Sequence, residues 1–290
     1  GNTEEARMLA TVIGLGSMGR RRASILKGLG FQVEGIDPNV VLPGISSVEK
    51  PSGDVVFVCT PPDVREEPIR MALEHGRPML IEKPLAAPGA LSDETLDELR
   101  KHPCRVSENL LYSTETRLFF NAARDACCPV IHGYFNHDLS RWRPKTDYKQ
   151  SYNAKNTYSL VFDCHEINML CNYFGRPTGV EALFSQKGKG MEAFRSLQAF
   201  VKWKETSCLL SLSYNGGYSR GWYTMGIKNV FAVTLDSAGI EPTYLKETSD
   251  FLLAAEIVGG LKLQDWALDA MDVHQAVIQS HEKKKWISLS

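Results

Sequence analysis

A short apolar run followed by three spaced glycines constrains the fold of this chain more than any other feature. Residues 9–13 read Leu-Ala-Thr-Val-Ile, and the glycines follow as Gly14-x-Gly16-x-x-Gly19. This pattern is typical of a strand that turns tightly into a helix in a dinucleotide-binding unit. Gly14 makes the turn, Gly16 lets the backbone approach a pyrophosphate, and Gly19 allows the helix to pack closely on the strand. The pyrophosphate is expected on exposed N–H groups at the helix start, around Ser17 and Met18.

A carboxylate stands where such a unit binds the adenosine ribose. The apolar strand expected at residues 31–36 ends in Asp37, 18 residues after Gly19. An acid at this place accepts hydrogen bonds from the ribose hydroxyls and repels a 2′-phosphate, which favours NAD over NADP. Asp37 could instead begin an Asp-Pro turn. Residues 20–22 are all arginine; one of them reaching a 2′-phosphate would allow NADP, whereas a solvated helix face is the simpler interpretation.

Composition excludes several classes of protein. The chain has 290 residues, 43% of them hydrophobic, and a net charge of −1, which indicates a globular protein of two domains. The balanced charge argues against binding to nucleic acid or to an anionic membrane. No apolar run approaches the roughly 20 residues that span a bilayer. The acidic N-terminus lacks the apolar core of a signal peptide, so we expect a cytoplasmic location.

Cysteine and histidine spacing predicts no metal site. The seven cysteines are odd in number and form no Cys-x-x-Cys pair, which argues against both a zinc site and a disulfide framework. The histidines at positions 132, 137, 274 and 281 show no metal-ligand spacing either.

The first 120 residues alternate strands with helices, as a parallel sheet requires. A buried strand expected at residues 54–59 ends in Thr60-Pro61-Pro62, and another at 78–81 delivers Glu82-Lys83-Pro84 to its carboxyl end. Ligands bind at that edge of open α/β sheets. Only 16 residues lie between Asp37 and Asp54. This is too few for a full crossover helix with its loops, although a compressed helix stays open.

The second half of the chain predicts another kind of sheet. Alternating apolar residues indicate strands at 197–203 and 208–214, with further strands at 129–139, 221–227 and 230–236. Asn215-Gly-Gly217 predicts a hairpin turn. The fold class expected is therefore α/β: an N-terminal Rossmann dinucleotide-binding domain and a C-terminal α+β domain with an open, mostly antiparallel sheet. Helices on one face would leave the other face for a homodimer or homotetramer.

Four motifs in this order resemble the Gfo/Idh/MocA family of nicotinamide-dependent sugar and polyol dehydrogenases. They are the glycine pattern, Cys59-Thr-Pro-Pro62, Glu82-Lys-Pro84 and a later His165 near the start of a helix. The resemblance implies a Rossmann domain at 1–120, a substrate and oligomerisation domain at 121–262, and a segment at 263–290 that packs back on the first domain. Residues 139–154 resemble a subgroup often associated with surface-sugar or nonulosonic-acid biosynthesis.

The resemblance also implies roles for individual residues. Thr60, Pro61, Pro62, Glu82 and Lys83 would contact the cofactor, with Glu82 orienting Lys83. The Lys83 ammonium would bind the reacting oxygen and stabilise charge on it as hydride moves. His165 would act as the general base that takes the hydroxyl proton. Without the family, Lys83 reads as a surface lysine and His165 as a histidine bonded to nearby backbone.

Two further assignments are open to alternatives. The family places an acid three or four positions before the histidine, whereas Asp163 precedes His165 by two; Asp163 would be catalytic, or would form a helix-capping box with Glu166. A polar and aromatic loop offers stacking rings and charged donors for a sugar, or is simply a surface loop. Its candidate substrate residues are Arg141, Trp142, Arg143 and Tyr148.

These observations predict an NAD(P)-dependent oxidoreductase that acts on a secondary alcohol or ketone of a sugar. One alternative is a hydrolase or lyase that keeps its NAD and uses transient oxidation. The other, motivated by the altered segment before His165, is a cofactor-binding scaffold or sensor without turnover.

Overall fold

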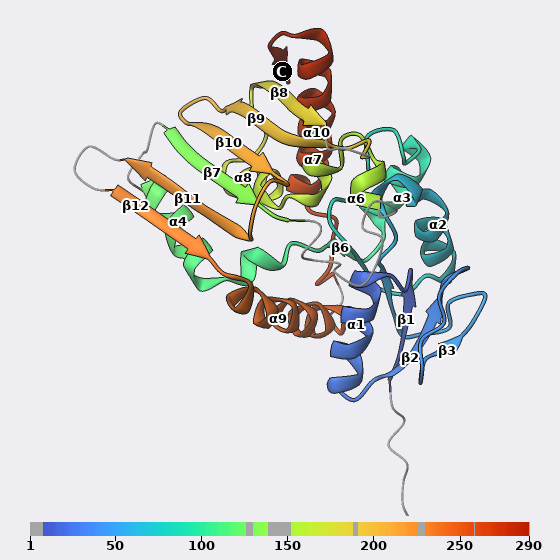
Figure 1. The fold of residues 1–290 in the computed structure, drawn as a ribbon. Coiled ribbons are helices and arrows are strands. Elements are labelled where there is room, and N and C mark those ends of the chain that lie inside the picture. The colour runs from blue at the N-terminus through green and yellow to red at the C-terminus, as the bar shows by residue number, and fades with distance from the viewer. Residues whose placement is uncertain are drawn as a thin grey trace, which may run out of the picture. The chain divides into compact units, whose positions relative to one another are not determined.

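The chain divides into two compact units, which are described separately. Our computed structural model describes residues 8–125, 130–138, 152–187, 191–225, 230–257 and 259–289. Unit 1 contains Gly1–Ser107 and Tyr244–Gln264, and unit 2 contains Glu108–Thr243 and Asp265–Ser290. Figure 1 shows the fold and labels most of its helices and strands. In the described part of the chain, no helix has both the length and the apolar character needed to cross a membrane.

Unit 1 is built on a parallel sheet with the strand order β3-β2-β1-β4-β5-β6. The strands are β1 (Leu9–Ile13), β2 (Gln32–Ile36), β3 (Ser46–Ser47), β4 (Val55–Val58), β5 (Met79–Ile81) and β6 (Cys104–Val106). Their connections contain α1 (Ser17–Gly28), the 3₁₀ helix η1 (Pro62–Val64), α2 (Glu66–His75) and α3 (Asp93–Lys101). Every residue of β4 and β5 is buried, as expected for strands with both faces covered. The predicted Rossmann arrangement is thus confirmed.

The short connection after β2 contains no helix. Between Asp37 and Asp54 the chain forms only β3, which pairs with β2, so the compressed crossover helix that the sequence left open is absent. Glu34 of β2 is buried and fixes the end of this connection. Its carboxylate accepts hydrogen bonds from the Thr11 hydroxyl at 2.5 Å and from the Ser52 N–H at 2.6 Å. The Ser52 hydroxyl donates to the same carboxylate at 2.7 Å, so polar contacts rather than a packed helix hold the end of this connection.

The core of unit 1 includes a segment from far along the chain. Helix α9 (Ser237–Ala255) begins in the unit 2 range and ends in unit 1. Its Phe251 is fully buried and meets Phe57 of β4 edge to face, with ring centroids 5.4 Å apart. Leu261, after the helix, joins the same cluster. Burial of these side chains ties residues 244–264 to the Rossmann sheet.

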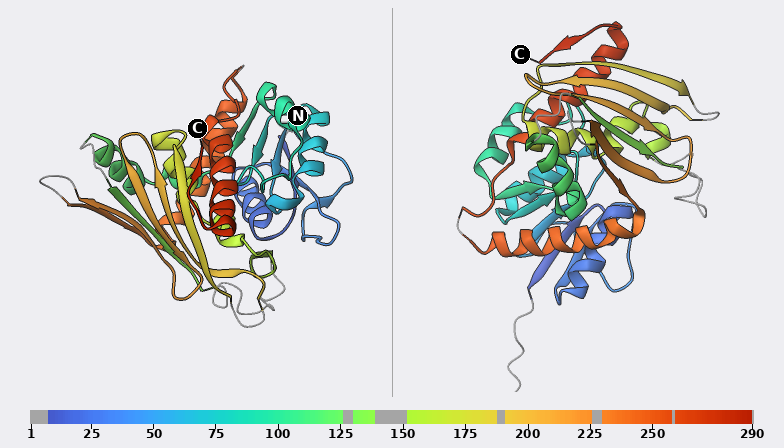
Figure 2. Two further views of the ribbon diagram at one scale, coloured as in Figure 1. Left: turned by 90° about the horizontal axis from the view of Figure 1, so that it is seen from above. Right: turned by 90° about the vertical axis from the view of Figure 1, so that its left-hand side faces the viewer.

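Unit 2 is built on a mixed, mostly antiparallel sheet with the order β12-β11-β7-β10-β9-β8-β13. Its strands are β7 (Val130–Asn136), β8 (Gly179–Lys187), β9 (Phe194–Lys202), β10 (Ser207–Ser213), β11 (Ser219–Met225), β12 (Val230–Leu235) and β13 (Ile287–Ser288). Only the pair of β7 and β10 is parallel. The helical elements are η2 (Asn109–Tyr112), α4 (Thr114–Asp125), α6 (Tyr152–Lys155), α7 (Ser159–Asp163), α8 (Glu166–Phe174) and α10 (Asp265–Lys283). Figure 2 shows helices gathered on one face of this sheet.

The hairpin predicted at Asn215-Gly-Gly217 is wrong. Strand β7 lies between β10 and β11, pairing in parallel with one and antiparallel with the other. Local turn residues predict that the chain bends, but they do not exclude a third strand that inserts between the two arms. The strands themselves match the predicted ranges closely.

The observed units also differ from the predicted domain limits of 1–120, 121–262 and 263–290. Helix α4 belongs to unit 2 because its Phe120 packs edge to face on Trp222 of β11, with centroids 4.8 Å apart. Residues 244–264 belong to unit 1, and the C-terminal residues 265–290 belong to unit 2. There β13 pairs with β8, and Ser280 of α10 bonds the Ala182 N–H at 2.9 Å. The hydrophobic pattern located these elements but not the surface on which each one packs.

Candidate functional site

The glycine turn of unit 1 has the geometry that its sequence predicts. Gly14 has a φ of +88°, and a Cβ there would lie 2.9 Å from the Thr60 nitrogen. A Cβ on Gly19 would lie 1.9 Å from the Gly14 oxygen, so neither position accepts a side chain. Gly16 differs, because a Cβ there would meet nothing within 4 Å. It is the N-cap of α1 and, as a glycine, has no side chain to cap that helix. Among the described residues the first N–H groups, with exposed Ser17 and half-buried Met18, are therefore available to an anion.

Asp37 lies at the carboxyl end of β2, partly exposed, as expected for a ribose ligand. One carboxylate oxygen accepts the Leu15 N–H at 2.7 Å, inside the glycine turn. The other accepts the N–H groups of Asn39 at 2.9 Å and Val40 at 3.0 Å. These bonds fix the carboxylate. They also show that Asp37 begins a turn at Asp37-Pro38, as the alternative interpretation predicted. Since a carboxylate offers about four acceptor positions, binding a ribose hydroxyl remains compatible with this arrangement.

The residues that follow β4 lie beside the glycine turn, where Thr60 contacts Gly14. Pro61 is the N-cap of η1, and Pro62 begins it. The Thr60 hydroxyl oxygen is buried and has no hydrogen-bond partner in the part of the chain that the structure describes. A buried hydroxyl without a partner costs free energy unless a ligand or water satisfies it. The open helix start, the bare Gly16 and this hydroxyl fit a dinucleotide.

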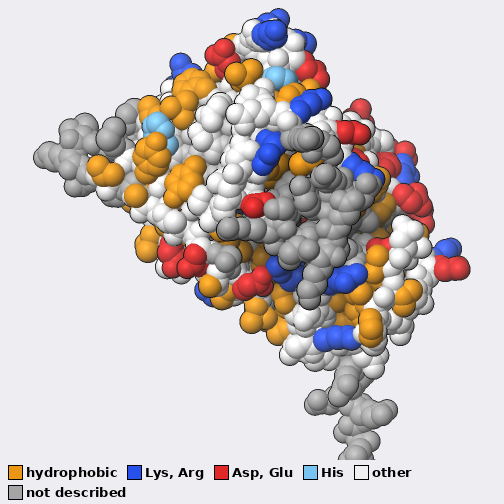
Figure 3. Space-filling model, viewed as in Figure 1, with side chains coloured by type: hydrophobic (Ala, Val, Ile, Leu, Met, Phe, Trp, Pro, Cys, Tyr) orange, Lys and Arg blue, Asp and Glu red, His pale blue; other side chains and the backbone are white. Residues whose placement is uncertain are grey.

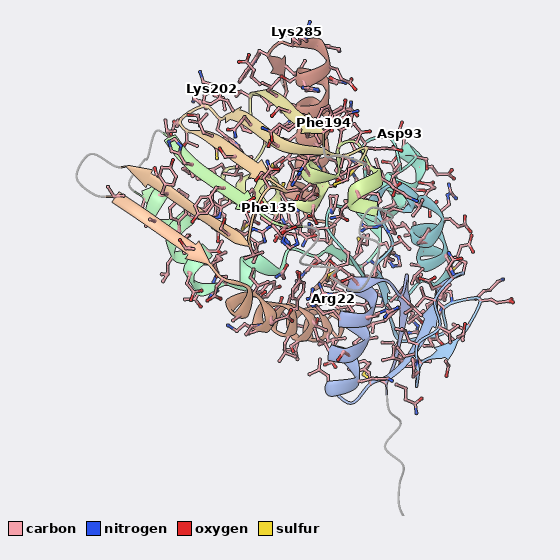
Figure 4. All side chains as sticks on the ribbon, viewed as in Figure 1. Arg22, Asp93, Phe135, Phe194, Lys202 and Lys285 are labelled. Carbon is pink, nitrogen blue, oxygen red and sulfur yellow. The ribbon has the colours of Figure 1, made fainter. Side chains whose placement is uncertain are left out.

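Lys83 follows β5 at the sheet's carboxyl edge and is half-buried. Its neighbour Glu82 is expected to contact the cofactor and to orient Lys83. In the structure the Glu82 carboxylate accepts the Arg22 Nε–H at 2.7 Å. Arg22, labelled in Figure 4, is fully buried rather than part of a solvated face. Its other donors bond Glu247 at 2.6 Å and Ser107 at 2.8 Å.

The charges of this cluster depend on one another. Burial raises the pKa of Glu247. Burial would raise the pKa of Glu82 too, but the charge of Arg22 and its hydrogen bond outweigh it and lower that pKa. Arg22 thus faces two carboxylates in a site without solvent, and ion pairs in such sites are sensitive to the loss of one partner.

In unit 2, His165 forms a buried pair that the sequence analysis missed. Its Nδ1 lies 2.6 Å from the Glu108 Oε1, and the side chains are 9% and 0% exposed. The other Glu108 oxygen accepts the Asn168 amide at 3.0 Å. A carboxylate accepts, so Nδ1 carries a proton; in the neutral form of the ring the lone pair is then on Nε2. This is the arrangement of a general base held by an orienting acid.

His165 is also held through its backbone. It is the N-cap of α8, and its N–H donates to the Glu166 carboxylate at 2.9 Å. The other oxygen of Glu166 accepts the Arg220 Nε–H at 2.8 Å, and both side chains are buried. The Arg220 guanidinium lies 4.3 Å from the Phe135 ring centroid, a residue labelled in Figure 4. Glu166 therefore caps toward His165 and pairs with Arg220, and the predicted capping box with Asp163 does not form.

Asp163 ends α7 and contacts a tyrosine. The Tyr214 hydroxyl donates to its carboxylate at 3.3 Å. Burial, and then the charge of Asp163, raises the pKa of Tyr214 well above its usual value, so the hydroxyl keeps its proton. The other predicted substrate residues, Arg141, Trp142, Arg143 and Tyr148, lie outside the described residues. Among those described, no group of three or more His, Cys, Asp or Glu side chains could hold a metal ion.

A signal for Glu108 was present in the sequence. It comes two residues after the end of β6, as Lys83 comes two residues after the end of β5. Residues 105–109 read as a single strand from sequence, whereas β6 ends at Val106 and Glu108 lies beyond it. Its partner His165 is 57 positions away, so no local pattern joins the two.

Known protein families and structures show what this chain resembles. Residues 41–110 match the model of the Gfo/Idh/MocA family, an oxidoreductase family with an NAD-binding Rossmann fold. No curated protein matches the chain significantly in sequence. The matched range includes both strand-end motifs, Thr60-Pro61-Pro62 and Glu82-Lys83-Pro84.

Solved structures share the fold over nearly the whole chain. Myo-inositol 2-dehydrogenase from Lactobacillus plantarum is 17% identical, with 98% of this chain and 100% of that chain covered and a TM-score of 0.78. GenD2 from gentamicin A biosynthesis, solved with NAD, is 15% identical over 98% and 97%, with a TM-score of 0.81. Myo-inositol dehydrogenase from Lactobacillus casei, solved with NAD(H) and myo-inositol, is 14% identical over 98% and 97%, at 0.77. The chain thus shares its fold with these dehydrogenases, and residues 41–110 are similar to the Gfo/Idh/MocA oxidoreductase family.

Proposed function

We propose that this chain is an NAD-dependent oxidoreductase that oxidises a secondary alcohol of a sugar or cyclic polyol, or reduces the matching ketone. The glycine turn carries the proposal, because Gly14 and Gly19 have no room for a side chain while Gly16 borders open space. Packing within the turn explains the glycines at 14 and 19 but not the one at 16. A pyrophosphate that approaches the backbone closely at residue 16 would explain the third glycine. The inositol dehydrogenases among the structural neighbours suggest the substrate class.

The chain's own residues supply the proton chemistry. In the oxidising direction, the His165 Nε2 takes the hydroxyl proton while hydride leaves the same carbon, so an alcohol becomes a ketone and the imidazole becomes imidazolium. Glu108 keeps the proton on Nδ1 and stabilises the imidazolium that forms. Lys83 donates a hydrogen bond to the reacting oxygen. Bound NAD supplies the hydride acceptor. Asp163 is proposed to act in the same reaction.

The cofactor proposal is tested by calorimetry with NAD and NADP on Gly16→Val and its matched control Gly28→Val. Both glycines lie on α1 or at its start, and a Cβ at either one meets nothing within 4 Å. Only the first fills the space assigned to pyrophosphate. We expect Gly16→Val to weaken NAD binding roughly tenfold or more, since hydrogen bonds to charged groups contribute about 1.5–3 kcal/mol. Equal binding by both variants, or no nucleotide binding by the unaltered protein, would reject the proposal.

The choice between NAD and NADP rests on Asp37. We expect Asp37→Ser to narrow the preference for NAD, because the carboxylate no longer repels a 2′-phosphate. Product analysis then separates the reaction types. Net NADH formation with a sugar indicates a dehydrogenase, whereas product without net NADH indicates transient oxidation. A scaffold would be favoured by two results together. The unaltered protein would turn over no sugar, and Lys83→Ala would still bind the nucleotide.

We also propose that two copies associate through the open sheet face of unit 2. Phe200, Leu209, His132 and Tyr223 lie directly opposite one another across four adjacent strands. Leu209 and Tyr223 are 41% and 42% exposed, and Figure 3 shows hydrophobic side chains over this face. Exposed apolar rows of this kind mark association surfaces. Sedimentation of Leu209→Glu should show a smaller species than the unaltered chain; an unchanged size would exclude this face.

A further inference from the structure

Arg65 is a buried arginine whose contacts are backbone carbonyls. It immediately precedes α2 and is 2% exposed. Its Nε–H donates to the Thr60 carbonyl at 2.8 Å. Its Nη1 donates to the carbonyls of Glu82, Pro84 and Leu85, the last two at 2.6 and 3.1 Å. An arginine has five donors in a fixed planar fork, so one side chain can bond several carbonyls at once.

These carbonyls belong to the two segments that the site depends on. Glu82 and Pro84 flank Lys83 in the chain, and Thr60 follows β4 beside Gly14. Regular strand bonding stops before Lys83, since the last such bond runs from the Glu82 N–H to the Val58 carbonyl at 2.9 Å. Beyond that point Arg65 bonds the backbone on both sides of the lysine.

A lysine ammonium stands on a flexible stem of four carbons. Its position is therefore only as well defined as the backbone from which the stem starts. Fixing the carbonyls before and after Lys83 fixes the direction of its Cα–Cβ bond. Small displacements of a catalytic group are costly, because a shift of about 1 Å can lower a rate by about 100-fold.

We propose that Arg65 is a positioning residue that holds the backbone of Lys83 and the Thr60 turn in one hydrogen-bonded frame. The proposal rests on the proposed role of Lys83 in the reaction. Arg65 itself touches neither substrate nor cofactor in this scheme, and it acts through the two segments it bonds. Burying a guanidinium costs free energy, and the carbonyls of the Lys83 segment and Thr60 offset that cost.

Arg70 offers a matched control on the same helix. Its side chain is 36% exposed and pairs with Glu66 and Glu94. Exposed pairs of this kind contribute little to stability. Arg65→Met and Arg70→Met therefore remove the same group from α2 or its start, but only the first removes bonds to the Lys83 segment.

The test reads Lys83 directly, without nucleotide or substrate. Lysines are dimethylated with ¹³C-formaldehyde, and the Lys83 signal is assigned by its absence in Lys83→Arg. We expect the unaltered protein and Arg70→Met to show the same Lys83 signal, and Arg65→Met to shift it or merge it with those of exposed lysines. Should Arg65→Met not fold, Arg65→Gln, which removes the charge, takes its place.

An unchanged Lys83 signal in folded Arg65→Met or Arg65→Gln would overturn the proposal. This outcome is independent of the calorimetry with NAD, so failure of the positioning role and failure of the cofactor assignment can be told apart. With a substrate in hand, Arg65→Met should lower kcat by about 100-fold relative to Arg70→Met with KM little changed. A rise in KM alone would also contradict a role exerted through Lys83.

Discussion

Lys83 and His165 each have a glutamate as a neighbour in sequence, and each of these glutamates pairs with a buried arginine. In unit 1, Glu82 precedes Lys83 and pairs with Arg22. In unit 2, Glu166 follows His165 and pairs with Arg220. The two units differ in which part of the expected catalytic residue is held by further hydrogen bonds. The His165 ring itself bonds Glu108, whereas in unit 1 the recorded bonds of Arg65 hold the backbone on both sides of the lysine.

The difference follows from the chemistry of the two side chains. An imidazole has two distinct nitrogens, and its use as a base depends on which one carries the proton. A partner on the ring is therefore needed. An ammonium presents three equivalent donors, so its function depends on position alone. The His165 ring is therefore held by a partner that selects its protonated nitrogen, whereas for Lys83 it is the backbone position that is held.

The two arginines also differ in their partners. Arg22 bonds two buried carboxylates, Glu82 and Glu247. Arg220 bonds one, and its guanidinium otherwise lies over the rings of Phe135 and Tyr218. Removal of Arg22 takes a bound arginine from two buried carboxylates, and removal of Arg220 takes one from a single carboxylate.

The largest effect is expected for Arg22→Met. Breaking a buried ion pair on one side costs about 3–5 kcal/mol, and the loss of a cation from two buried carboxylates places this variant at the upper end. The free energy of unfolding, measured by urea denaturation, should fall by that amount, while Arg70→Met should lose under about 1 kcal/mol. If Arg22→Met and Arg70→Met have the same free energy of unfolding, burial does not determine how much each arginine contributes to stability.

Arg220→Met comes next, at about 3 kcal/mol, because one carboxylate loses its partner. The same denaturation experiment gives the value. If this variant loses more than Arg22→Met, the number of unpaired carboxylates does not explain the difference between the units. In that case the contacts of the guanidinium with aromatic rings carry more of the stability than the comparison assumes.

Glu108→Gln tests the bond to the ring. Without a carboxylate, the proton on Nδ1 is no longer fixed and the imidazolium loses its stabilising charge. We expect kcat to fall by about 100-fold, the lower range for general base catalysis. The ¹⁵N signals of His165 should show a mixture of the two neutral forms. Glu181→Gln, an exposed change on β8, is the control; a single unchanged ring form in Glu108→Gln would contradict this role.

The smallest effect concerns an exposed pair, Glu66 with Arg70. Burial would raise the pKa of Glu66, but hydrogen bonds from Thr95, Ser92 and Arg70 lower it to about 2 from the usual 4.5. The ionised form therefore adds stability above about pH 4.5, and this is lost as the pH falls toward 2. Glu66→Gln should cost under about 1 kcal/mol near neutral pH. The difference from the unaltered chain should shrink over that window in urea unfolding, and a constant difference would refute the assignment.

Much of the fold could be predicted because its signals are local. The requirement for glycine at 14 and 19 comes from contacts within one turn, and buried strands end visibly at Thr60 and Glu82. The inserted strand β7 could not be predicted, because turn residues do not report which strands pair. The same limit explains the domain boundaries, since Phe120 shows that α4 is amphipathic but not that it packs on Trp222.

The site was harder to predict than the fold. Three consecutive arginines carry no periodicity, so nothing in the sequence marked Arg22 as the buried one. Glu108 and Arg220 reach their partners only after the chain has folded, across 57 and 54 positions. His165 and Lys83 were found through the resemblance to a family, whereas the residues that hold them were not.

The path of the chain has a practical consequence for dissecting this protein. It passes from one unit to the other after Ser107, after Thr243 and after Gln264, so neither unit is one continuous segment. A truncation at any one point leaves at least one unit incomplete, and no single cut separates the two units as intact pieces. To express the nucleotide-binding unit alone, residue 107 would have to be joined to residue 244 by a designed linker, with expression ending at 264. Proteolysis at a single internal bond should likewise release no independently folded half.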